Sequence, residues 1–133
     1  MGAPEELAYL AARCLSCGIW IAAGLYKAAH YEATVAEMAH HRIPWPQAVL
    51  VGVLALEFGG SVLLLANLHV WAVAIAWIAF MVPASLVYHA FLTPARGIDF
   101  VQFVLFWKNV SIAGGLVALI LLDPSRPDWL LRH

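Results

Sequence analysis

Four long runs of apolar residues dominate this chain and limit the folds that it can adopt. They cover about residues 7–26, 47–66, 70–89 and 100–122. A helix of about 20 apolar residues crosses the hydrocarbon core of a bilayer, which is about 30 Å thick. Within that core a helix satisfies its own backbone N–H and C=O groups. The sequence therefore predicts an all-α integral membrane protein, a four-helix bundle that forms a single domain over residues 1–133.

The composition favours a membrane protein over a soluble one. Hydrophobic residues make up 64% of the chain, charged residues 11%, and the mean hydropathy is +0.85. Soluble domains contain about 45–50% apolar and about 25% charged residues. The formal net charge is -1 and the chain has no block of basic residues, which argues against a nucleic-acid partner. We expect the lipid bilayer to surround most of the protein.

The connection between the first two runs is expected to contain a short interfacial helix. Residues 28–46 interleave charged and apolar side chains, and Glu32 to Glu37 fit one short helix. Pro44 and Pro46 each disfavour helix in the residue before them, so the helix should end there. Basic residues are divided evenly between the two sides of the four spans, and the positive-inside rule gives no orientation.

Two charged residues lie deep within the apolar runs. Glu57 is ten residues into the second run, and Lys108 is eight residues into the fourth. At about 1.5 Å per residue, they lie about 15 and about 12 Å from the same membrane surface. A lone charge at such a depth costs about 3 kcal/mol on insertion scales. We therefore expect Glu57 and Lys108 to pair across facing helices, either to fix the helix register or to act directly in function.

Other polar residues are expected in the same half of the bundle. Lys27 ends the first run, His89 ends the third, Gln102 begins the fourth, and Asn109 follows Lys108. Together these residues predict either a polar pocket that opens at the membrane surface or a paired structural network. The candidate ligand-binding residues are Glu57, Lys108, Asn109, Gln102, His89 and Lys27. The glycine pairs 59–60 and 114–115 are expected to be sites of close helix packing.

Cys14 and Cys17 have the CxxC spacing of redox-active thiols. Both lie inside an apolar helix, in the half opposite Glu57, where thiols pack as small hydrophobic groups. Redox activity is therefore the weaker alternative to packing. A structural zinc site needs four ligands, and no second cysteine pair exists, so we predict no metal site. A bis-histidine haem needs two histidines on facing helices at matching depth. Only His30 and His89 approach this arrangement, and both lie near one interface, so haem binding is a weak alternative.

The order of several short motifs resembles the DoxX family. The motifs are Arg13, Gly24-Leu-Tyr-Lys27, Pro44, Glu57-Phe-Gly-Gly60, His89, and Phe106-Trp-Lys-Asn109 followed by Gly114-Gly115. The resemblance extends from about Arg13 to Leu122. It implies a small four-helix protein of bacterial or archaeal membranes, here a multi-pass protein of the inner (cell) membrane. It also implies an association with quinone-linked oxidation and with membrane oxidoreductase assemblies.

The favoured hypothesis is an inner-membrane subunit that supports quinone-linked redox chemistry, with other protein subunits carrying the redox cofactor. The polar residues would then bind a quinone headgroup, and no covalently bound cofactor is expected. The alternative is a non-catalytic anchor or assembly subunit, in which the same residues only fix helix packing. A small transporter is a weaker third hypothesis, because the chain shows no discontinuous helix pair and no inverted repeat. The sequence assigns no catalytic residue.

Overall fold

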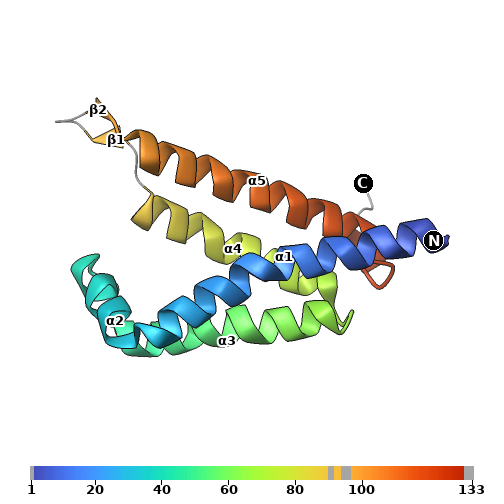
Figure 1. Ribbon diagram of the computed structural model, residues 1–133, viewed down its shortest axis with the longest axis horizontal. Helices are drawn as coiled ribbons and strands as arrows, with labels where there is room; N and C mark the ends of the chain where they lie inside the picture. Colours follow the sequence, from blue (N-terminus) through green and yellow to red (C-terminus); the bar gives the residue numbers. More distant parts are fainter. Residues whose placement is uncertain (1, 90–91, 94–96, 131–133) are drawn as a thin grey trace. The chain divides into compact units, whose positions relative to one another are not determined.

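Four long helices carry most of the chain in the computed structural model (Figure 1). They are α1 (Ala3–Ala29), α3 (Pro46–Leu65), α4 (Val70–Tyr88) and α5 (Phe100–Leu122). Each is long and apolar enough to cross a membrane. The structure describes residues 2–89, 92–93 and 97–130. The predicted all-α membrane fold is confirmed, and the first helix is longer at both ends than its apolar run.

Four short elements complete the described part of the chain. The predicted helix between the first two spans is α2 (Tyr31–His40), which is longer than the expected 32–37. Strands β1 (Leu92–Thr93) and β2 (Gly97–Ile98) pair antiparallel between α4 and α5. A turn of 3-10 helix, Asp128–Leu130, follows α5.

The chain divides into two compact units, Met1–His69 and Val70–His133, each built around one pair of long helices. A single domain over the whole chain stays a prediction. In the first unit α1 packs on α3, and α2 packs on the early part of α3. In the second unit α4 packs on α5.

The contacts between α1 and α3 show that these helices run antiparallel. Near the start of α1, the Arg13 guanidinium donates from Nη1 to the carbonyl oxygen of Leu64, at 3.2 Å. Near the end of α1, Gly24 lies under the ring of Phe58. A Cβ at position 24 would come within 2.9 Å of the Phe58 ring, so glycine allows the two helices their close approach here.

Three of the four glycines in the predicted packing pairs do not lie at a close helix contact within their own unit. A Cβ added at Gly59, Gly114 or Gly115 would meet nothing within 4 Å. Gly60 is buried on α3. Gly24, which has no glycine neighbour in the sequence, is a position of close approach.

Candidate functional site

The buried carboxylate of Glu57 forms an ion pair with Lys27. The Lys27 Nζ atom on the last turn of α1 lies 2.6 Å from Glu57 Oε1 on α3. The side chain of Glu57 is 2% exposed, and that of Lys27 is 24% exposed. Glu57 Oε2 is buried and has no hydrogen-bond partner among the described residues. One oxygen of this carboxylate thus pairs with a cation, while the other accepts no hydrogen bond from the described residues.

Within the first unit the partner of Glu57 is therefore Lys27, a pairing that the sequence analysis did not predict. The expected contact with Lys108, which belongs to the second unit, stays a prediction. The depth calculation counted only from the ends of the apolar runs and treated Lys27 as the end of a helix at the surface. In the structure, α2 follows α1 and packs on the first turns of α3. Tyr31 at the start of α2 donates its hydroxyl to the Gln47 carbonyl oxygen, at 3.4 Å. Helix α1 therefore ends part of the way along α3, at the level of Glu57. Lys108 is exposed on α5.

Two hydrogen bonds between side chains join α4 to α5. His89 Nδ1 lies 2.9 Å from the amide oxygen of Gln102, which can only accept, so the ring nitrogen donates. Asn109 donates from Nδ2 to the hydroxyl oxygen of Ser85, at 2.9 Å. The predicted residues His89, Gln102 and Asn109 therefore do lie between helices. The Ser85 partner was missed, although it lies four residues before His89 and hence on the same side of α4.

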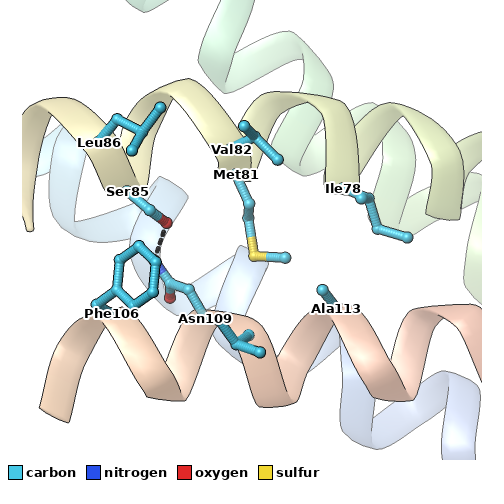
Figure 2. A pocket seen from close by; sticks show the side chains of 9 residues that line it. Ile78, Met81, Val82, Ser85, Leu86, Phe106, Asn109 and Ala113 are labelled. Carbon is cyan, nitrogen blue, oxygen red and sulfur yellow. Dashed lines mark hydrogen bonds between the residues drawn. The ribbon is translucent and has the colours of Figure 1, made fainter. Parts of the chain in front are cut away.

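A mainly apolar groove of about 150 Å³ lies between α4 and α5 (Figure 2). Ser85 on α4 and Asn109 on α5 point toward each other from the facing helices and are joined by their hydrogen bond. The Ser85 hydroxyl accepts this bond and keeps its own hydrogen, and the Asn109 amide keeps a second N–H. Neither of these hydrogens has an acceptor among the described residues. The groove is lined by Ile78, Met81, Val82, Ser85, Leu86, Phe106, Asn109, Val110 and Ala113.

The cysteines are free thiols in different surroundings. Cys14 is exposed, while Cys17 is buried and donates from Sγ to the Ser61 carbonyl oxygen, at 3.7 Å. The packing interpretation accounts for Cys17, and redox activity of the pair stays a prediction. Across the described ranges, no three His, Cys, Asp or Glu residues are grouped so that they could hold a metal ion.

Asp123 is a further buried carboxylate, and it directly follows the last apolar residue of α5. It is 1% exposed at the end of α5. Its Oδ2 accepts from the backbone N–H of Trp71 at the start of α4, at 2.8 Å. Its Oδ1 accepts from the backbone N–H and the hydroxyl of Ser125, each at 2.8 Å. This carboxylate therefore ties the start of α4 to the end of α5.

Replacing Asp123 with alanine is expected to lower the free energy of unfolding by about 1–3 kcal/mol, because it leaves the partly buried N–H of Trp71 without its acceptor. Titration of the detergent-solubilised protein with SDS measures the change. Asp123→Asn keeps a carbonyl oxygen for Trp71 and is expected to lose less. Equal stability of wild type and Asp123→Ala would show that the contact contributes nothing.

The four apolar helices, with polar groups bonded inside each pair, define a multi-pass membrane protein. The sequence pattern of the DoxX family matches residues 8–90, more than half of the chain. This protein belongs to the DoxX family. The inner membrane protein YphA of Escherichia coli (strain K12) is 25% identical over 124 residues, which cover 93% of this chain and 89% of YphA. No solved structure matches the chain.

These comparisons confirm the predicted family and the predicted location, a multi-pass protein of the inner (cell) membrane. The family match ends just after α4. The motif from Phe106 to Asn109 therefore lies outside it, although the sequence interpretation used that motif. The similarity to YphA, in contrast, extends over nearly the whole chain.

Proposed function

We propose that this protein is a membrane subunit that binds a quinone and supports quinone-linked redox chemistry within an oxidoreductase complex. The observation that carries the proposal is the groove between α4 and α5, with Ser85 and Asn109 beside it. Its walls are apolar and can therefore contact the carbon ring of a quinone and its substituents. Ligand sites of this kind combine apolar walls with a few well-placed polar groups.

The volume and the apolar lining of the groove fit a single quinone ring, and Ser85 and Asn109 lie at its wall. An apolar cavity of about 150 Å³ is large enough for a molecule the size of benzene. A quinone carbonyl only accepts hydrogen bonds, and the remaining hydrogens of Ser85 and Asn109 are donors. Phe106 and Met81 line the walls, and a phenyl ring and a flexible thioether can both pack against the flat, unsaturated ring of a quinone. These residues would hold the ring and orient one carbonyl oxygen.

A bound quinone would supply two-electron, two-proton chemistry, and the redox cofactor that exchanges electrons with it belongs to a partner subunit in this proposal. The residues of this chain bind and orient the ring and exclude water from it. His89 and Gln102 are bonded to each other farther along the same two helices, where they help to hold α4 and α5 together. This proposal assigns the headgroup to Ser85 and Asn109, and no longer to Glu57 and Lys108.

Replacing Asn109 with leucine is expected to weaken the binding of a short-chain benzoquinone by about tenfold, the equivalent of about 1.4 kcal/mol. The loss arises because one donor disappears while the apolar walls remain. Equilibrium titration of the protein in nanodiscs measures the affinity. Lys108→Met is the matched control, since Lys108 is the adjacent residue and is exposed. Unchanged binding by Asn109→Leu, or a wild type that binds no quinone, would overturn the proposal.

One observation favours a second role as an assembly subunit. Lys108 is exposed on α5, well inside an apolar span, and it makes no hydrogen bond or ion pair within the ranges that the structure describes. A charge there costs about 3 kcal/mol unless it finds water or a partner. A carboxylate on a helix of another subunit would offset this cost. Loss of co-purifying subunits from Lys108→Met, with no quinone binding by wild type, would favour the assembly role.

A further inference from the structure

The Lys27–Glu57 pair has a feature that an ordinary structural ion pair lacks. Both oxygens of a buried carboxylate normally find donors, because a bare charged oxygen in a low-dielectric medium is costly. Here Lys27 holds Oε1 at 2.6 Å, while Oε2 has no donor among the described residues. Oε2 exposes almost no surface, which leaves little room for a larger ligand. A proton is the one ligand that needs no additional space.

We propose that Lys27 and Glu57 form a proton-exchange site, in which Glu57 takes up one proton per chain from the aqueous side through Lys27. This inference is independent of the quinone groove. Lys27 suits the role because its ammonium group contacts Glu57 while its side chain is 24% exposed. The side chain of Glu57, in contrast, is only 2% exposed. The lysine therefore links a buried acceptor to the outside of the protein.

The exchange proceeds in balanced steps. The Lys27 ammonium gives a proton to Glu57 Oε1, which leaves a neutral amine and a neutral carboxylic acid. The amine then takes one proton from hydronium ion or a buffer acid and becomes ammonium again. Rotation of the carboxyl group by half a turn brings the protonated oxygen to the position of Oε2, and the other oxygen again faces Lys27. No bond between heavy atoms changes, and nothing is oxidised or reduced.

The other titratable groups on the helices that pack against α3 are engaged elsewhere or exposed. On α1, Arg13 donates to the Leu64 carbonyl and Cys17 donates to the Ser61 carbonyl. Tyr9 is the ring that Arg13 covers, and Tyr26 stacks on His30. On α2, Tyr31 donates to the Gln47 carbonyl oxygen. The remaining groups of α2 are the exposed side chains Glu32, Glu37 and His40. Within this unit, Lys27 is thus the charged group in contact with Glu57.

Infrared difference spectroscopy tests the proposal on the full chain in liposomes. A drop in pH is expected to produce a carboxylic-acid C=O band that is missing from Glu57→Gln. The Glu57→Gln spectrum serves to separate Glu57 from the other carboxylates of the chain. An unchanged difference spectrum in Glu57→Gln would overturn the proposal, because the band would then belong to other residues.

Lys27→Arg tests the route of the proton and keeps the ion pair intact. An arginine guanidinium remains protonated in proteins, so it can hold Glu57 but cannot pass a proton to it. After a rapid pH change, we expect the Glu57 band to appear at least about tenfold more slowly in this variant than in wild type. Equal rates would show that Lys27 is not on the route. Quinone binding is expected to be unchanged in both variants, so failure of this proposal is distinguishable from failure of the groove.

Discussion

Replacing Lys27 with methionine is expected to lower the free energy of unfolding by about 3–5 kcal/mol at neutral or alkaline pH. The change removes the only donor that holds the carboxylate of Glu57 within the described residues, and Glu57 is 2% exposed. An unpaired buried charge is much more costly than a missing surface contact. At low pH the loss should shrink, because a protonated Glu57 no longer needs a cation. SDS titration of the protein in mixed micelles measures the change.

The double variant Lys27→Met/Glu57→Leu separates the ion pair from the packing around it. Replacing both partners with apolar side chains leaves no charge to desolvate, so most of the lost stability should return. Lys108→Met is the control for loss of a lysine from an apolar span, and it should have little effect on unfolding, since Lys108 is exposed. A single variant Lys27→Met as stable as wild type would show that the pair contributes nothing to the fold.

The sequence predicted the four helices well, because span length and apolar content depend on the bilayer rather than on tertiary contacts. It also identified most of the polar residues that lie between helices, since a charge or amide in an apolar run is visible without a structure. It did not predict the pairing of Glu57 with Lys27. That pairing depends on where α1 ends along α3, which the packing of α2 determines. The periodicity of apolar residues does not indicate where along α3 the helix α1 ends.

The roles of Ser85 and Asp123 were missed for a related reason. A serine in an apolar helix is common and carries no charge, so nothing distinguished Ser85 until the antiparallel register of α4 and α5 placed it opposite Asn109. Asp123 follows the last apolar residue and looks like a solvated tail residue. Its function became visible only when the register brought it to the backbone N–H of Trp71. Contacts between distant parts of the chain were the information that the sequence lacked.

Filling the groove between α4 and α5 is expected to abolish quinone binding. Ala113 lines the groove on α5 (Figure 2), and a phenylalanine there would occupy much of the space of about 150 Å³. The added ring competes directly with the ligand, whereas the donors Ser85 and Asn109 stay in place. We expect a rise in Kd of about a hundredfold or more, which corresponds to at least about 2.7 kcal/mol. Ala118→Phe is the matched control, because Ala118 is exposed on the same helix and does not line the groove.

Titration of a short-chain benzoquinone into wild type, Ala113→Phe and Ala118→Phe in nanodiscs is therefore the most direct test of the proposed function. Saturable binding to wild type and Ala118→Phe, with none to Ala113→Phe, is the predicted result. The thermal unfolding of each variant shows whether it is folded under the same conditions. Wild-type affinity in a folded Ala113→Phe protein would contradict the assignment of the quinone to this groove.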